Sequence, residues 1–260
     1  EAAEAVDTAT ATIARLLGTR PKEIVFTSGA TESNNLALLG AAAYYTRKTK
    51  KKAGHIVSVA TEHRAVLDPL AELAKSGWEV TLLPVAEHTA AEAGRIDIAA
   101  LEAALRDDTL LVSVMLANNE IGVIQPLEQI AALCKSRNIL LHTDAAQAVG
   151  KIPLDIEKLG IDLVSFSGHK LYGPRGVGVL VARRQKGKAP LTAQLFGGGH
   201  QGGLRSGTLN VPAIVGLARA MELAIEELPA ETVRLAGLRN QLLTGLQAQL
   251  DGVVLNGPLL

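Results

Sequence analysis

Residues 110–116 are Leu110-Leu111-Val112-Ser113-Val114-Met115-Leu116, an apolar run interrupted by a single serine. A strand with one face in water alternates apolar and polar residues, and this run does not alternate. Continuous apolar strands are typical of parallel sheets that are covered on both faces. The run therefore predicts a buried strand in a mostly parallel sheet.

Short runs of the same kind recur along the chain and alternate with longer segments of helical period. The predicted fold class is α/β, with a mostly parallel seven-stranded sheet and helices on both faces. Active-site residues are then expected just beyond the carboxyl ends of the strands. The seven predicted strands are Ile24–Thr27, His55–Ala60, Glu79–Val85, Thr109–Leu116, Ile139–Asp144, Ile161–Ser167 and Val177–Val181.

Both ends of the sequence look like interior parts of a larger protein. The chain begins inside one, over residues 1–17, with no start signal. We expect a large domain over residues 1–211, then connecting helices and the start of a smaller domain over 212–260, with both ends being cuts through a larger protein. The C-terminal part is predicted to form two helices and one strand, at Pro212–Glu227, Thr232–Leu250 and Val253–Leu255.

Charge and composition exclude several classes of function. The 260 residues include 26 basic and 26 acidic side chains, so no overall electrostatic footprint for nucleic acid or an anionic membrane is present. No apolar run approaches the roughly 20 residues of a membrane span, and no signal peptide opens the chain. The basic run Arg47–Lys52 is predicted to be a solvated loop rather than a binding patch.

Cys134 is the single cysteine of the chain. It excludes an intramolecular disulfide framework and fits a reducing compartment, so we expect a cytoplasmic or other reducing intracellular location. Its spacing from Ile130 and Leu133 places the three side chains on one helical face, which predicts burial. The alternative, a nucleophilic Cys134, requires a mobile and exposed setting.

The first cluster of candidate site residues follows the strand at 24–27 and opens a helix. Free N–H groups at a helix start, with hydroxyls beside them, bind phosphate. The cluster also fits an ordinary cap, with Ser28 or Thr31 serving the first turn, and the sequence leaves both interpretations open. It is Thr27-Ser28-Gly29-Ala30-Thr31-Glu32-Ser33-Asn34-Asn35.

The second cluster, His142-Thr143-Asp144-Ala145-Ala146-Gln147, ends the strand at 139–144. A carboxylate at the end of a buried strand is costly unless it meets a cation or hydrogen-bond donors. A protonated pyridine nitrogen is such a cation. Alternatively, Asp144 caps the next turn.

The third cluster follows the strand at 161–167 and contains Ser167-Gly168-His169-Lys170. A lysine in a glycine-flanked turn has a backbone free to approach a ligand, and its amine can form a Schiff base. A solvated surface lysine is the alternative. Together, the three strand ends predict a phosphate cradle, a carboxylate for a ring nitrogen and a reactive lysine at one sheet edge. This combination predicts pyridoxal 5'-phosphate (PLP) as the cofactor.

The fourth cluster, residues 196–208, has too many glycines for a strand or a helix. It is either a flexible loop or a segment whose hydroxyls and Arg205 meet a phosphate, including that of a neighbouring subunit.

These motifs resemble the class V aminotransferase-like cysteine desulfurases that supply iron–sulfur cluster assembly. The resemblance runs in order through nearly the whole chain and implies the large domain of PLP fold type I. The matching motifs are Ser28-Gly29-Ala30-Thr31-Glu32-Ser33-Asn34-Asn35, Thr61-Glu62-His63, Asn118-Asn119-Glu120, Asp144-Ala145-Ala146-Gln147, Ser167-Gly168-His169-Lys170 and Arg205-Ser206-Gly207-Thr208.

The resemblance implies a role for each matched residue. Lys170 would hold PLP covalently and shuttle protons, and Asp144 would bind the pyridinium nitrogen. His63 would stack on the ring and handle protons. Gln147 would bond the phenolic oxygen, with Asn119 near that oxygen and the substrate. The phosphate would be held by Ala30, Thr31, Ser167, His169 and the partner subunit's counterpart of Thr208, which implies a homodimer.

The implied reaction converts L-cysteine to L-alanine and passes sulfur to an enzyme cysteine, and from there to sulfur-acceptor or iron–sulfur scaffold proteins. In this family that cysteine and a carboxylate-binding arginine lie in a smaller C-terminal domain. The sequence ends at Leu260 before either, so we expect this chain alone to be inactive.

Two rival functions remain open. A selenocysteine lyase or another class V PLP enzyme shares most of the motifs, although Arg205-Ser206-Gly207-Thr208 favours the desulfurase. A catalytically inactive binding or scaffold module is the rival of a different class. No Gly-x-Gly-x-x-Gly follows the first strand, which argues against a dinucleotide site.

Overall fold

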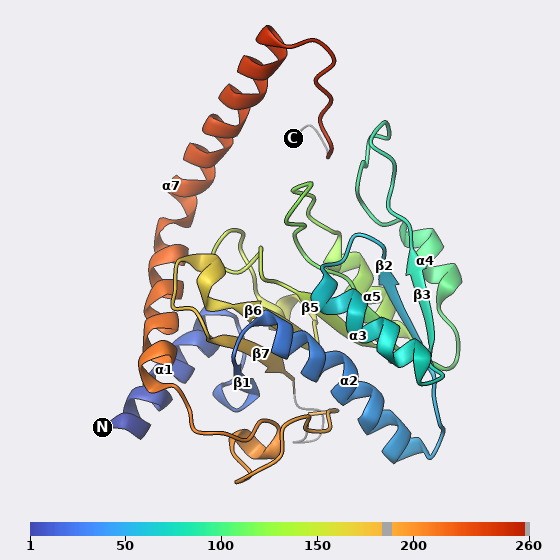
Figure 1. The fold of residues 1–260 in the computed structure, drawn as a ribbon, viewed down its shortest axis with the longest axis vertical. Helices are drawn as coiled ribbons and strands as arrows, with labels where there is room; N and C mark the ends of the chain where they lie inside the picture. Colours follow the sequence, from blue (N-terminus) through green and yellow to red (C-terminus); the bar gives the residue numbers. More distant parts are fainter. Residues whose placement is uncertain (184–188, 258–260) are drawn as a thin grey trace.

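The computed structural model describes residues 1–183 and 189–257. Seven strands form one sheet in the order β1-β7-β6-β5-β4-β2-β3 (Figure 1), which confirms the predicted α/β class. Five of the seven strands are shorter than expected at one end, β1 has the expected bounds, and β7 is shifted by one residue. The seven strands are β1 (Ile24–Thr27), β2 (His55–Val59), β3 (Glu79–Leu83), β4 (Thr109–Ser113), β5 (Leu140–Asp144), β6 (Leu163–Ser167) and β7 (Gly178–Ala182).

The sheet is mostly parallel, as predicted. The neighbours from β3 through β2, β4 and β5 to β6 pair in parallel. β7 alone runs the other way and pairs antiparallel with both β6 and β1, so that Gly178 lies opposite both Ser167 and Thr27. The carboxyl ends of β1, β4, β5 and β6 therefore meet the start of β7 at one edge of the sheet.

Helices cover both faces of the sheet (Figure 1). On one face α2 and α3 pack over a core that includes Leu38 and Leu111. On the other face a larger core includes Ile13 and Val112 beneath the remaining helices. Leu111 and Val112 are both fully buried on opposite faces, which explains why the run at 110–116 does not alternate. The helices are α1 (Ala2–Leu16), α2 (Ala30–Thr49), α3 (Arg64–Lys75), α4 (Ile98–Ala104), α5 (Leu127–Ser136), α6 (Ile156–Leu159) and α7 (Val211–Gln249).

The C-terminal part differs from the prediction. One helix, α7, replaces the two expected over 212–250, although Pro229 lies inside it. Proline removes one N–H donor and frees one carbonyl a turn earlier. Pro229 is exposed and Ile225, whose carbonyl is freed, is half-buried, so water can reach this turn, and the alanine, leucine and glutamate residues around it favour helix.

Residues 253–255 are not a strand in the structure, and Val254 is 65% exposed. A strand needs a neighbour for its backbone bonds, and none of the seven described strands pairs with this segment. The division into domains at residue 211 stays a prediction. Residues 258–260 of its second part lie outside the described residues, and the start of α7 packs into the core through Ile214 and Leu217.

The basic run is exposed as predicted, but its first half is helical. α2 continues to Thr49 and ends at Lys50, which adopts the left-handed conformation with φ 61°. Arg47 and Lys48 each lie 5.7 Å from the ring centroid of Tyr44, a contact that supports the last helical turn. No helix within residues 1–183 or 189–257 is both long and apolar enough to cross a bilayer.

Candidate active site

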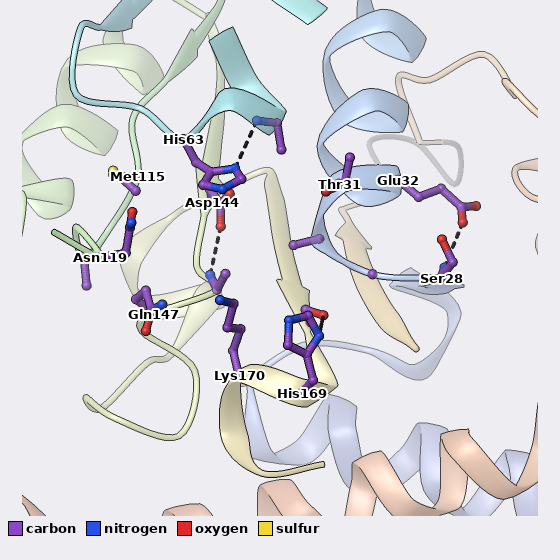
Figure 2. Close-up of a pocket in the computed structure, with 16 residues that line it drawn as sticks. Ser28, Thr31, Glu32, His63, Met115, Asn119, Asp144, Gln147, His169 and Lys170 are labelled. Atoms are coloured by element: carbon purple, nitrogen blue, oxygen red, sulfur yellow. Dashed lines mark hydrogen bonds between the residues drawn. The ribbon is translucent and has the colours of Figure 1, made fainter. Parts of the chain in front are cut away.

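A cavity of about 350 Å³ opens at the sheet edge where the strand ends meet. Figure 2 shows residues from all three strand-end clusters around it, so the predicted convergence is confirmed. Every predicted site residue except Thr208 lines it. The lining residues are Ser28, Gly29, Ala30, Thr31, Glu32, His63, Ala65, Met115, Ala117, Asn119, Asp144, Ala146, Gln147, Ser167, His169 and Lys170.

One end of the cavity is the N-terminus of α2. The cap residue is Gly29, and no side chain bonds to the first turn as a cap. The N–H groups of the first turn of a helix have no partner within the helix, and Ala30 and Thr31 bring theirs to the cavity. The alternative in which Ser28 or Thr31 caps this helix is therefore wrong. This end is suited to an anion.

Gly178 makes room for this turn, and the sequence analysis did not single it out. A Cβ on Gly178 would lie 2.5 Å from the Cα of Gly29 and 2.7 Å from the carbonyl oxygen of Phe166. Only glycine lets the backbone of the turn approach β7 so closely. A glycine at the start of an apolar strand was the available signal.

Beside the turn, the hydroxyl of Ser167 lies 2.8 Å from Nδ1 of His169. Both residues line the cavity. They add polar side-chain groups to the backbone N–H groups of α2, as expected for a phosphate site.

The other end of the cavity is formed by Asp144, which is 4% exposed. Its Oδ1 accepts the N–H of Ala146 at 2.9 Å. Its Oδ2 accepts a hydrogen bond from Nδ2 of Asn34 at 2.7 Å. One oxygen thus serves the following turn, as the alternative interpretation held, and the other is bonded to the side chain of Asn34.

The ionisation of Asp144 depends on opposing effects. Burial raises the pKa of its carboxyl above the ordinary value, whereas the bonds from Ala146 and Asn34 and the charges of His63 and Lys170 lower it. No ion pair is formed by Asp144 among the described residues. A cationic group in the cavity would complete its environment.

Asn34 is a second residue to which the sequence analysis gave no role. It is fully buried on α2, one turn beyond the open N-terminus. Its bond to Asp144 joins the anion-binding end of the cavity to the carboxylate end. No sequence signal distinguished Asn34 from its half-buried neighbour Asn35.

Lys170 lies on a short 3₁₀ turn, Gly168–Leu171, directly after β6. In Figure 2 its side chain extends from this turn toward Asp144, and the ring of His63 lies over the same carboxylate. Lys170 is exposed to the cavity. The amine, the carboxylate and the anion-binding turn therefore surround one volume.

His63 has a structural role in addition to lining the cavity. It is the N-cap of α3, and its Nδ1 accepts the N–H of Ala65 at 3.0 Å. A neutral imidazole that accepts at Nδ1 carries its proton on Nε2. That nitrogen is left for a ligand.

The remaining predicted residues are more exposed than Asp144. Asn119 is exposed at the cavity, and Gln147 accepts a hydrogen bond from the amine of Lys151. Thr208 is exposed and lies outside the cavity lining, so its role across a dimer stays a prediction. Its loop is tied to α2 by Arg205, which donates to Glu32 at 2.8 Å.

Cys134 is 1% exposed and packs in the core under α5, as predicted. Burial, assisted by the negative charge of Asp162, raises the pKa of its thiol to about 12. The thiolate is therefore scarce at neutral pH. Cys134 does not line the cavity.

The residues present fit PLP. An uncapped helix start and two polar side chains suit its phosphate, Asp144 suits a protonated ring nitrogen, and Lys170 suits its aldehyde. The unpartnered Oδ1 of buried Asn34 shows that the polar groups behind Asp144 are not fully satisfied by the protein alone. The fold and this site define the fold type I class of PLP enzymes.

The chain belongs to the class V aminotransferase family, whose model matches residues 1–258. The curated relatives include "Cysteine desulfurase IscS" from Salmonella arizonae, 52% identical over 259 residues. A similar protein from Salmonella paratyphi B is 51% identical. Both matches cover 100% of this chain and 61% of the relative, so the chain spans about three fifths of their length.

Solved structures agree with this assignment. A "NifS-like protein" superposes with a TM-score of 0.87 at 41% identity, covering 95% of this chain and 65% of that one. DndA from Streptomyces lividans superposes with a TM-score of 0.84 at 45% identity, covering 94% and 67%. The family implies the use of PLP.

Proposed function

We propose that the chain is the PLP-binding core of a cysteine desulfurase that converts L-cysteine to L-alanine. The observation that carries the proposal is the placement of Lys170 in one cavity with Asp144 and the uncapped start of α2. The relatives named cysteine desulfurase support the choice of reaction. A solved neighbour at 40% identity, described as SspA in complex with cysteine, supports the choice of substrate.

PLP, when bound, supplies an electron sink for the substrate's bonds. Lys170 would hold it covalently and, when released by the substrate, carry protons with its amine. Asp144 would hold a negative charge against the ring nitrogen and keep that nitrogen protonated. His63 would cover one ring face, with the proton on its Nε2 available for transfer.

The other residues would fix the orientation of the cofactor. The N–H groups of Ala30 and Thr31, with Ser167 and His169, would hold the phosphate. Gln147 would donate to the phenolic oxygen, with Asn119 beside it and the substrate. Thr208 would reach the phosphate of the partner subunit in a homodimer.

The sulfur would pass to a thiol other than Cys134, whose burial and raised pKa leave it unreactive. From that thiol it would go on to sulfur-acceptor or iron–sulfur scaffold proteins. A chain with a single cysteine has no internal disulfide framework, which is the basis for expecting a reducing, cytoplasmic compartment.

Borohydride trapping tests the cofactor assignment. The protein reconstituted with PLP should show a visible absorption band that borohydride removes, and mass spectrometry should place the adduct on Lys170. Lys170→Ala should abolish the adduct, whereas Lys151→Ala should keep it. An adduct on another lysine would contradict the proposal.

Product analysis tests the reaction. Full-length protein should form alanine from L-cysteine, and Cys134→Ala should leave PLP binding intact. A strong preference for L-selenocysteine would favour the lyase, and PLP binding without turnover of either would indicate an inactive module.

A further inference from the structure

Glu62 is a buried acid that the proposed mechanism does not use. It is 6% exposed and lies behind the cavity wall rather than in its lining. Its Oε1 accepts the N–H of Met115 at 2.5 Å, and its buried Oε2 has no hydrogen-bond partner. Such a group needs an explanation, because an unpaired buried polar atom costs stability.

The bond to Met115 joins two loops that both contribute to the cavity. Glu62 directly precedes His63 in the loop after β2, while Met115 lies beyond the end of β4, and both His63 and Met115 line the cavity. Asn118 makes a second link, since its Nδ2 donates to the carbonyl of Thr61 at 2.9 Å. The two links fix the position of His63 relative to the segment that carries Asn119.

The charges around Glu62 indicate its protonation state. Among the described residues no lysine, arginine or histidine forms an ion pair with it. The charged group that faces it is Asp144 on β5, which is also negative. Asp144 accepts two hydrogen bonds and Glu62 only one, so the negative charge is better supported on Asp144.

We propose that Glu62 is a positioning residue. As a neutral acid, it ties the loop that carries His63 to the segment that carries Met115 and Asn119, and it leaves the buried negative charge at the cavity to Asp144. The part of this inference that concerns the cofactor rests on the function proposed above. The part that concerns the charge of Glu62 does not.

The charge state has a consequence for stability. Burial, together with the negative charge of Asp144, raises the pKa of Glu62 from 4.5 to about 8, against the lowering effect of the Met115 hydrogen bond. An acid whose pKa is raised by folding stabilises the protein below its unfolded pKa, and this contribution is lost as the pH rises through the folded pKa. Asp144, whose pKa is also raised, acts in the same direction.

The first experiment compares melting temperatures of the cofactor-free full chain between pH 5 and pH 8. We expect wild type to lose stability over this interval and Glu62→Gln to lose clearly less. Glu120→Gln, which alters an exposed carboxyl nearby, should behave as wild type. An equal pH dependence in wild type and Glu62→Gln would overturn the neutral-acid assignment.

The second experiment measures PLP affinity by absorbance titration at pH 7. Glutamine keeps the acceptor for the Met115 N–H without adding charge, so Glu62→Gln should bind within about threefold of wild type. Glu62→Ala removes the acceptor and should weaken binding by about tenfold, as expected when a buried N–H is left unpaired. Wild-type affinity in Glu62→Ala, or a loss in Glu62→Gln as large as in Glu62→Ala, would overturn the positioning role.

The two experiments separate this inference from the proposed function. Absence of PLP binding by the wild-type protein would contradict the proposed function. The cofactor-free comparison would still decide whether Glu62 is neutral. If Glu62→Ala does not fold, hydrogen exchange at the Met115 amide in Glu62→Gln decides the link, with strong protection expected and fast exchange overturning it.

Discussion

Helices α2 and α3 begin at the same edge of the sheet, but only α3 has a side-chain cap at its N-terminus. α3 is closed by its own cap residue, since His63 accepts the N–H of Ala65. α2 begins at Gly29 without any side-chain cap, although its N-terminus also faces the cavity. The difference leaves the first N–H groups of α2 free to meet an anion in the cavity, whereas one N–H group of α3 is already satisfied by its cap.

The largest expected effect comes from a substitution that crowds the uncapped N-terminal turn of α2. Gly178→Ala would place a Cβ 2.5 Å from the backbone of Gly29, so the turn must shift. We expect a loss of about 1–3 kcal/mol in stability and a large loss of PLP affinity, measured by denaturant unfolding and absorbance titration. Gly237→Ala, on α7 with open space around it, should be neutral or slightly stabilising. Unchanged PLP binding in Gly178→Ala would show that the turn does not hold the phosphate.

The cap of α3 can be removed by a substitution that leaves the uncapped start of α2 unchanged. His63→Ala removes the cap of α3 and should cost about 1 kcal/mol. His63→Ser replaces the cap and should recover most of that stability, while PLP binding stays weak because the ring is absent. Urea unfolding and PLP titration measure the two effects separately. Recovery of PLP affinity in His63→Ser would mean that His63 acts only as a cap.

Glu32 partly restrains the open turn, and its loss should have a smaller effect. It accepts the N–H of Ser28 at 2.8 Å and pairs with Arg205. Burial raises the pKa of Glu32, but the bonds from Arg205 and Ser28 outweigh burial and hold it below 4.5. Its stabilisation is therefore present above pH 4.5 and is lost as the pH falls through the lower folded pKa.

Glu32→Gln should cost about 0.5 kcal/mol at neutral pH and should flatten the fall in melting temperature below pH 4.5. Glu128→Gln, at an exposed position on α5, is the matched control. An acid-side profile identical to wild type would mean that the pair does not form in solution.

The smallest effect is expected from an anion alone. Inorganic phosphate at a concentration equal to its Kd should stabilise the cofactor-free protein by about 0.4 kcal/mol, relative to chloride at the same ionic strength. Ser167→Ala should reduce this shift, and His63→Ala should not. A shift that is the same in all variants would place the anion elsewhere.

The sequence predicted those features that one strand or one turn encodes locally. The run at 110–116 predicted a strand buried on both faces, because its neighbours Leu111 and Val112 fill different cores. The polar residues at the ends of β5 and β6 predicted the cavity, because parallel strands end at one edge. The bounds of most of these strands were inexact.

Features that depend on distant segments were not predictable in this way. Gly178 matters because β7 returns to pair with β1, and Asn34 matters because its α2 side chain reaches Asp144 on β5. Neither contact has a local signature. The break expected near Pro229 was wrong for a related reason, since only the exposure of that turn to water makes the proline tolerable.

The pairing of β1 with β7 also bears on how the protein forms as it is synthesised. β1 leaves the ribosome well before its neighbour β7 and the side chain of Gln201, which bonds Phe26 from 175 residues away. Closing so long a loop is slow because its entropy is lost before the contacts form. The nascent chain therefore carries an unpaired β1 until β7 is complete, and in this interval chaperone protection of that edge would matter most.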